Sequence, residues 1–315
     1  KEELTKVSRE FGIKVIFFDG RGGPPARGGG KTHQFYASLG ETIEDEEIQL
    51  TVQGQTISSN FGTPDSCQYN LEQLLSSGIF NGVFSKKGKA FPEEDRTTME
   101  ELAELSYKAY SDFKEHPSFL GYLERMSTLK YYAKTNIGSR PSKRGKSEKL
   151  NFSDLRAIPF VGSWSQLKQN VPGFYGVGTA IEAFEKRGDF DKVQELYQNS
   201  LFFRTLLENS MMSLTKSFFG LTAYMHDDPE FGPFWDIIHD EYERTKRLLL
   251  KVSGYSELME EEQAGKASIQ ERERIVLPLL TIQQFALKKI QEMQRQENPD
   301  QAKLEMFEKM VTRSL

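Results

Sequence analysis

Short apolar runs in the first half of the chain predict strands, whereas the second half carries the longer period of amphipathic helices. Val15–Phe18 is a β-branched and aromatic run that is typical of a buried strand. Residues 48–54 alternate apolar and polar side chains, and residues 55–57 follow a glycine turn, which predicts a hairpin. Residues 131–141 and 155–160 indicate two further strands.

One helix is predicted in the first half, and helical spacing dominates after Thr179. Thr97 and Glu100 have the spacing of a capping box, and the helix that they start should end near Lys114. Trp164–Gln166 is expected to open another helix. The later periodicity predicts helices over 180–186, 190–197, 200–224, 229–253, 268–296 and from 299 to the end. One stripe at helical spacing is predicted to be core: Leu207, Met211, Leu214 and Phe218.

This order of elements indicates an α/β fold that is predominantly helical. Strands that alternate with helices, followed by an all-helical run, suggest part of a parallel β/α barrel with additional C-terminal helices. We therefore expect a partial barrel over residues 1–178 and a helical region over residues 179–315, which together form one continuous structural unit.

A glycine-rich segment follows the first predicted strand. Residues 15–33 read VIFFDGRGGPPARGGGKTH and contain six glycines together with Arg21, Arg27 and Lys31. Glycines let backbone N–H groups approach a ligand, and the cations suit phosphate or carboxylate. The alternative is a flexible surface loop. A P-loop is excluded because Pro25 occupies the position of its first glycine.

Composition narrows the class of protein. The chain has 315 residues, 37% hydrophobic and 28% charged, and a net charge of −5, which argues against nonspecific nucleic-acid binding. No apolar run reaches membrane-spanning length. The single cysteine, Cys67, cannot form an intrachain disulfide, which fits a reducing, cytoplasmic setting. The chain begins at Lys1 without an initiator Met, so we expect a piece of a longer protein.

Arginines near the predicted strands are the strongest chemical signal. None of the four histidines pairs with carboxylates at ligand spacing, so no metal site is expected within the chain. Arg21, Arg140 and Arg156 follow or lie in predicted strands, where barrel enzymes gather ligand contacts. Converging cations favour a small ligand that carries phosphate and carboxylate together. The alternative is that each arginine pairs with an acidic residue.

Several motifs together resemble the phosphoenolpyruvate carboxylase family. FDGRGG…ARGGGKTH is similar to the FHGRGG…GRGGGPTH signature of the family, and NIGSRP, LRAIPF, VPGFYGVG and SIQERERIVLPL resemble further family elements. The resemblance extends from Val15 to about Leu315. It departs from the family at Asp19, where the family has histidine.

The resemblance implies roles for particular residues. Arg21 and Arg156 correspond to substrate-phosphate arginines, and Arg140 to a mobile active-site arginine. Lys216 and Arg272 correspond to an inhibitor site for aspartate or malate, and Arg27 to a residue between the two sites. The fold implied is the C-terminal part of a TIM-like barrel.

The resemblance also implies a reaction and its requirements. Family members add bicarbonate to phosphoenolpyruvate and release oxaloacetate and phosphate, need Mg2+ or Mn2+, and are typically homotetramers. The metal ligands and a catalytic lysine are expected upstream of this chain, and an inhibitor-site asparagine downstream, so the fragment alone should be inactive.

Asp19 leaves two functional hypotheses open. An ionised aspartate repels an anionic intermediate that a histidine could stabilise or protonate. The protein is therefore either a carboxylase or a relative that retains the anion-binding and regulatory surfaces without carboxylation. A purely helical interaction domain fits the glycine and arginine motifs poorly.

Overall fold

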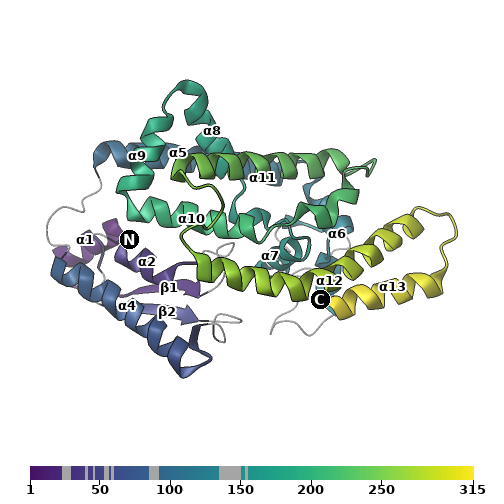
Figure 1. The fold of residues 1–315 in the computed structure, drawn as a ribbon, viewed down its shortest axis with the longest axis horizontal. Helices are drawn as coiled ribbons and strands as arrows, with labels where there is room; N and C mark the ends of the chain where they lie inside the picture. The colour runs from purple at the N-terminus through teal and green to yellow at the C-terminus, as the bar shows by residue number, and fades with distance from the viewer. Residues whose placement is uncertain are drawn as a thin grey trace. The chain divides into compact units, whose positions relative to one another are not determined.

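The structure, a computed structural model, is predominantly helical, as the sequence predicts (Figure 1). It describes residues 1–22, 30–39, 42–44, 47–52, 57, 60–84, 92–134, 150–152 and 155–315. These residues form two compact units, each composed of several stretches of the chain. Unit 1 comprises Lys1–Glu104, Ile181–Ser210 and Lys251–Gly254; unit 2 comprises Leu105–Ala180, Met211–Leu250 and Tyr255–Leu315.

Unit 1 contains a two-stranded parallel sheet. Strand β1 (Phe17–Gly22) pairs with β2 (Ile48–Val52), so that Phe17 lies opposite Ile48 and Asp19 opposite Leu50, with an irregularity between Asp19 and Gly22. Parallel pairing requires a crossover, and the described part of this crossover contains helix α2 (Thr32–Ala37). The helix buries Phe35 and Tyr36 against the β2 side chain Ile48, which ties the crossover to the sheet.

The remaining helices of unit 1 surround this core. They are α1 (Glu2–Glu10), α4 (Pro64–Phe84), α9 (Phe190–Asn199), and the portions of α5 (Glu93–Glu115), α8 (Val177–Arg187) and α10 (Leu201–Thr215) that belong to the unit. Leu74 of α4 and Phe202 of α10 pack on the Phe35 cluster, where the Phe35 and Phe202 ring centroids are 6.1 Å apart. Residues from widely separated stretches therefore form one core.

The described residues of unit 2 are mainly helical, with a single bridge residue at Leu155. It contains α6 (Phe119–Met126), α7 (Ala157–Gln166), most of α11 (Gly232–Ser253), α12 (Gln263–Gln294) and α13 (Gln301–Ser314), with 3-10 turns η2 (Leu129–Lys134), η4 (Val171–Gly173) and η5 (Phe219–Met225). Its centre is an aromatic cluster of buried side chains: Phe113, Phe119, Tyr122, Trp164 and Phe234. The rings of Phe113 and Phe234 stack at 5.1 Å, and such pairs add to the stability that burial provides.

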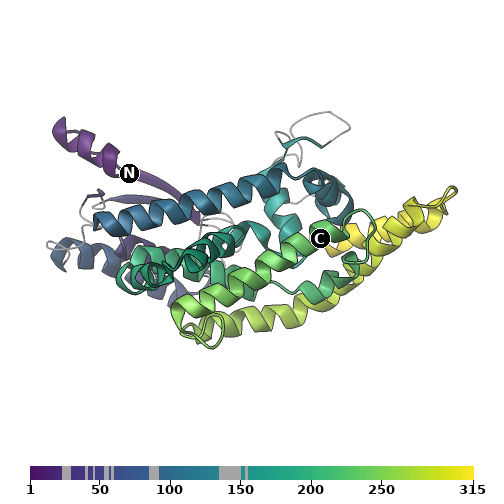
Figure 2. The same ribbon diagram turned by 90° about the horizontal axis from the view of Figure 1, so that it is seen from above.

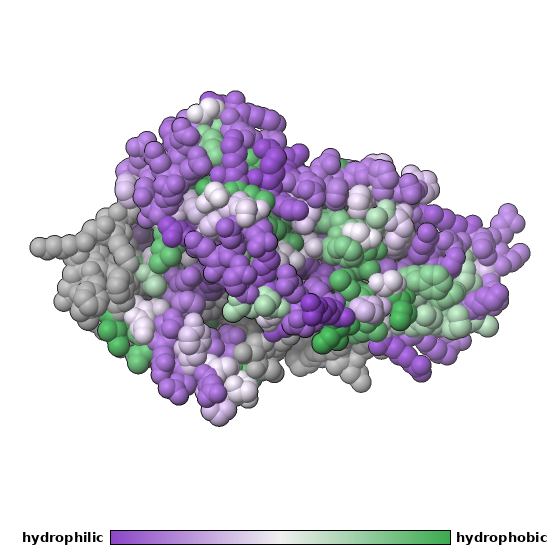
Figure 3. Space-filling model, in the orientation of Figure 1, coloured by the Kyte–Doolittle hydropathy of each residue, from purple (hydrophilic) through white to green (hydrophobic). Residues whose placement is uncertain are grey.

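Helices α12 and α13 form a hairpin at the C-terminal end of unit 2 (Figures 1 and 2). Asp300 caps α13 by accepting a hydrogen bond from the Lys303 backbone N–H at 3.1 Å. The two helices bury a second core with Tyr131 of η2. Hydrophobic side chains also reach the surface over these helices (Figure 3), among them Ile275, Leu279, Ile282, Phe285 and Met306.

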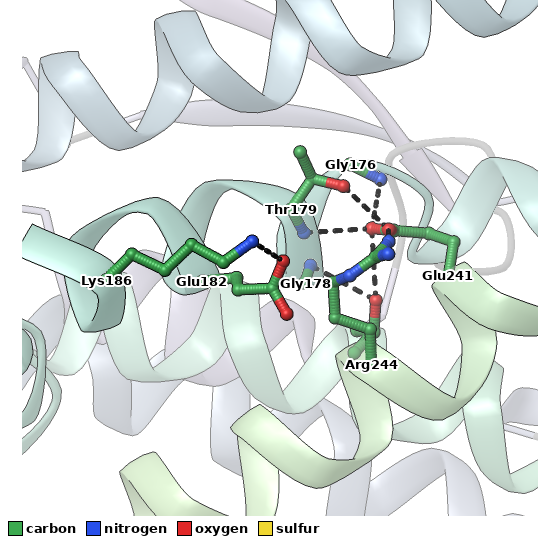
Figure 4. A network of polar contacts seen from close by, with 8 residues as sticks. Gly176, Gly178, Thr179, Glu182, Lys186, Glu241 and Arg244 are labelled. Carbon is green, nitrogen blue, oxygen red and sulfur yellow. Dashed lines mark hydrogen bonds and ion pairs between the residues drawn. The ribbon is translucent and has the colours of Figure 1, made fainter.

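A buried carboxylate organises the VPGFYGVG element within unit 2 (Figure 4). Glu241 of α11 is 1% exposed and accepts hydrogen bonds from the backbone N–H groups of Gly176, at 3.0 Å, and Thr179, at 3.1 Å. It also accepts the Thr179 hydroxyl at 2.7 Å and pairs with Arg244. Gly176 has a φ of +95°, and a Cβ there would lie 2.5 Å from the Ser106 carbonyl oxygen.

Several strand predictions are wrong. Strand β1 begins at Phe17 and continues to Gly22, and β2 pairs with β1 in parallel. The hairpin expected after β2 lies mostly outside the described residues, which resume at Ile57, and Ile57 is helical. Of the strand expected over 131–141, residues 131–134 lie in the 3-10 turn η2, and the rest lies outside the described residues. Of the strand expected over 155–160, residues 157–160 begin helix α7, which ends where a helix was expected to open. With two strands in the described part of the chain, the TIM-like barrel is not confirmed.

The helix predictions hold better. The helix expected from Thr97 to Lys114 begins earlier, at Glu93, and the six later elements follow the predicted order. The element predicted over 200–224 divides into α10 and η5. In its stripe Leu207, Met211 and Leu214 are buried, but Phe218 is 50% exposed because it lies beyond the end of α10. No helix among the described residues is long and apolar enough to cross a membrane.

Candidate anion-binding sites

Asp19 lies on β1 with two partners for its carboxylate. The Tyr36 hydroxyl donates a hydrogen bond at 2.8 Å, and the Lys1 ammonium lies at 2.6 Å from the same oxygen. The Asp19 side chain is 13% exposed, so this neutralisation occurs in a largely enclosed setting. A cation and a hydroxyl donor therefore share one oxygen of this carboxylate.

The end of the glycine-rich segment is held by helix α10. Asn209 accepts a hydrogen bond from the Lys31 backbone N–H at 3.3 Å, and the Lys31 ammonium pairs with Glu208 at 2.5 Å. Both side chains of this ion pair are at most 10% exposed. Gly30 has a φ of +117°, and a Cβ there would lie 2.1 Å from the Asn209 amide oxygen, so only glycine fits.

His33 follows on α2 and is half-buried. Burial, followed by the charge of Lys31, lowers the pKa of His33 below its ordinary value. The imidazole is therefore mainly neutral at physiological pH.

Arg156 lies at the N-cap position of α7 in unit 2. Its side chain is half-buried, and its Nε is buried without a hydrogen-bond partner among the described residues. A buried guanidinium N–H without an acceptor costs about 1–3 kcal/mol. This arrangement disfavours the alternative in which Arg156 pairs with an acidic side chain, and it suits an anionic ligand.

A second cationic group in unit 2 consists of Lys168, Lys216 and Arg272, with Glu273 as its counter-ion. Lys168 is 5% exposed and pairs with Glu273 at 2.5 Å. The Lys216 ammonium is half-buried, and it has no hydrogen bond or ion pair within the described ranges. Burial, and then the charges of Arg272 and Lys168, lower the pKa of Lys216. A carboxylate bound here would offset this repulsion.

The structure describes some of the predicted site residues and not others. Lys216 and Arg272 lie close enough for their charges to interact. The backbone of Arg21 belongs to β1, whereas Arg27 and Arg140 lie outside the described residues. Asp19 belongs to unit 1 and Arg156 to unit 2. The assigned roles of all these residues stay predictions.

Sequence reasoning missed the residues that support these cations. Two ion pairs are involved, Lys31 with Glu208 and Lys168 with Glu273, and each joins residues more than a hundred positions apart. Glu273 follows Arg272 directly in SIQERERIVLPL, which was a usable signal. No comparable signal marks Lys168, whose φ of 56° is set by the turn after α7.

The described residues offer no ligand set for a metal ion. No group of three or more His, Cys, Asp or Glu side chains in the described ranges is arranged to hold one. The divalent cation implied by the resemblance does not fit the residues that the structure describes.

Comparisons with known proteins identify the class to which this arrangement belongs. The family model described as phosphoenolpyruvate carboxylase matches residues 1–314, so the chain belongs to the phosphoenolpyruvate carboxylase family. A relative named phosphoenolpyruvate carboxylase, from Corynebacterium diphtheriae, is 31% identical over 291 residues. The match covers 89% of this chain and 32% of that relative, so the chain spans about a third of its length.

Proposed function

We propose that the full-length protein containing this chain is a phosphoenolpyruvate carboxylase. In this reaction a new carbon–carbon bond joins bicarbonate carbon to the methylene carbon of phosphoenolpyruvate, and oxaloacetate and phosphate are released. The observation that carries the proposal is Arg156, a half-buried arginine with an unpartnered Nε at the position where the family binds substrate phosphate. Family membership over residues 1–314 supports it.

Within this proposal, cations bind the substrate and offset its charge. Arg156 binds the phosphate together with Arg21, because guanidinium groups suit bidentate contacts with phosphate oxygens. Arg140 approaches the reacting atoms when substrate is bound. A divalent cation, Mg2+ or Mn2+, would polarise the anionic substrate, with ligands from outside the described residues. The fragment by itself is expected to be inactive.

We also propose a dicarboxylate effector site around Lys216 and Arg272, to which Arg27 contributes. The Lys216 ammonium supports this proposal because it forms no hydrogen bond or ion pair within the described ranges, while Glu273, the counter-ion of this group, is paired with Lys168. A bound carboxylate would balance the remaining positive charge. Aspartate and malate carry two carboxylates and match these cations. The proposed assembly of the full-length protein is a homotetramer, as is typical of the family.

A second candidate function rests on Asp19. Its carboxylate contacts Lys1 and Tyr36, and a carboxylate at the position of the family's histidine repels an anionic carboxylation intermediate. The alternative is a relative that binds the same anions without carboxylation. The two candidates differ in turnover and not in anion binding.

The test is phosphoenolpyruvate-dependent oxaloacetate formation by the full-length protein with bicarbonate and Mg2+, coupled to malate dehydrogenase. The carboxylase proposal predicts turnover, with Arg156→Ala reducing kcat/KM about tenfold or more, because a lost charge-assisted contact costs about 1.5–3 kcal/mol. The control is Arg274→Ala, because Arg274 is 76% exposed.

Asp19→His separates the two candidates. If the wild type turns over slowly and the histidine variant turns over faster, the protein is a carboxylase with a weakened site. If neither protein forms oxaloacetate although phosphoenolpyruvate still binds, the second candidate is correct.

A further inference from the structure

We propose that unit 2 contains a binding pocket for a small organic anion, formed by the end of α10, by α11 and by the start of α12. The pocket has a volume of about 340 Å3 and is lined by the end of α10, by α11, by residues 256–258 and by the first turns of α12. All its lining residues belong to unit 2.

The charge of the pocket is set by Lys246, Lys266 and Glu257. Lys266 is 15% exposed on its side chain and pairs with Glu257 at 2.5 Å. Lys246 is half-buried, and its ammonium forms no hydrogen bond or ion pair within the described ranges; it lies 5.9 Å from the centroid of the Tyr242 ring. The pocket therefore presents one cation without a carboxylate partner, and an anionic head group would supply this partner.

The rest of the lining is suited to an apolar or aromatic body. Leu214, Leu250 and Leu258 line the pocket beside the Tyr242 ring. That ring is held in place by Phe219, at a centroid distance of 4.7 Å. A preformed apolar wall with a few polar groups is the usual composition of a small-molecule site. The ligand class is thus a carboxylate or phosphate ester attached to a compact apolar or aromatic group.

This pocket shares no lining residue with the Lys168–Lys216–Arg272 group. Leu214, Thr215 and Ser217 line the pocket on either side of Lys216, but Lys216 itself does not. An effector bound near Lys216 and a ligand in this pocket would therefore depend on different side chains, and the inference stands independently of the proposed reaction.

The test uses phenyl phosphate and inorganic phosphate as probes in isothermal titration calorimetry with the full-length protein. Phenyl phosphate should bind more tightly than inorganic phosphate, because only the former occupies the apolar wall. Lys246→Met should weaken phenyl phosphate about tenfold or more, and Lys246→Arg should retain most of the affinity. Glu257→Gln should tighten binding, because it removes the negative charge that lines the pocket.

The matched control is Lys303→Met, since Lys303 is exposed on α13 and should not alter binding. Opposite effects of Lys246→Met and Glu257→Gln would support the proposal, because a loss of folding cannot increase affinity. Absence of saturable phenyl phosphate binding would overturn it. Equal affinity of the wild type and a folded Lys246→Met variant would overturn it as well.

Discussion

Glu241 is expected to be the most important single polar side chain for the stability of unit 2. Glu241→Ala removes the acceptor of the Gly176 and Thr179 backbone N–H groups and breaks the Glu241–Arg244 ion pair. The hydrogen bond from the Gly176 N–H is buried, the one from the Thr179 N–H is partly buried, and Glu241 itself is 1% exposed. The two N–H groups therefore lose an acceptor that solvent cannot readily replace.

The magnitude follows from these groups. Each unpaired buried donor costs about 1–3 kcal/mol, and breaking a buried ion pair costs about 3–5 kcal/mol. The Arg244 side chain is 31% exposed and can be hydrated in the variant, so the loss of this ion pair costs less than a fully buried one would. We expect Glu241→Ala to lower the free energy of unfolding by about 3–5 kcal/mol. Glu241→Gln should cost less, since its amide oxygen can still accept from the two N–H groups.

Urea unfolding followed by tryptophan fluorescence measures this loss. Both tryptophans of the chain, Trp164 and Trp235, are buried in the core of unit 2, so the signal reports this unit. Glu243→Ala is the control, because Glu243 is 54% exposed on the same helix and should change stability by about 0.5 kcal/mol or less. The reasoning is refuted if Glu241→Ala matches this control, or if Glu241→Gln costs more than Glu241→Ala.

Three further changes test other parts of the structure. Gly30→Ala should lower the thermal unfolding temperature and loosen the end of the glycine-rich segment, because the new Cβ collides with the Asn209 side chain. An unchanged melting curve would show that Gly30 and Asn209 are not in close contact. Lys216→Met should raise stability in urea unfolding, since it removes a half-buried cation. The pKa of Lys216 in the folded state lies below its ordinary value of 10.5, so the stability of the wild type rises as the pH approaches 10.5. The stability advantage of Lys216→Met over the wild type should therefore shrink at high pH. An advantage that does not change with pH would argue against the lowered pKa. Asp228→Asn should cost about 1–2 kcal/mol at neutral pH. Burial alone would raise the pKa of Asp228, but hydrogen bonds from Arg295 and two backbone N–H groups outweigh it, so the pKa is lowered. The stabilisation by the Asp228 carboxylate is present above its ordinary pKa of 3.8 and is lost as the pH falls below this value. If acid unfolding shows that Asp228→Asn destabilises the protein equally at every pH, the lowered pKa is contradicted.

The sequence alone determined the family and much of the helical second half. Buried positions at helical spacing, such as Leu207, Met211 and Leu214, mark a helix because one face must be apolar. The glycine and arginine motifs indicated the family that the comparisons then confirmed. The family resemblance predicts that Lys216 and Arg272 share one site; this stays a prediction, and the structure shows that their charges interact.

Only the tertiary structure decided how the short apolar runs fold and which side chains meet. Residues 131–134 and 157–160 are helical although the sequence predicted strands there, because a short apolar segment carries no period that distinguishes a strand from a helix. The pairing of β1 with β2 is likewise invisible in either strand. The ion pairs of Lys31 with Glu208 and of Lys168 with Glu273 join residues remote in sequence. Such contacts depend on the packing of whole helices, and local residue order does not contain that information.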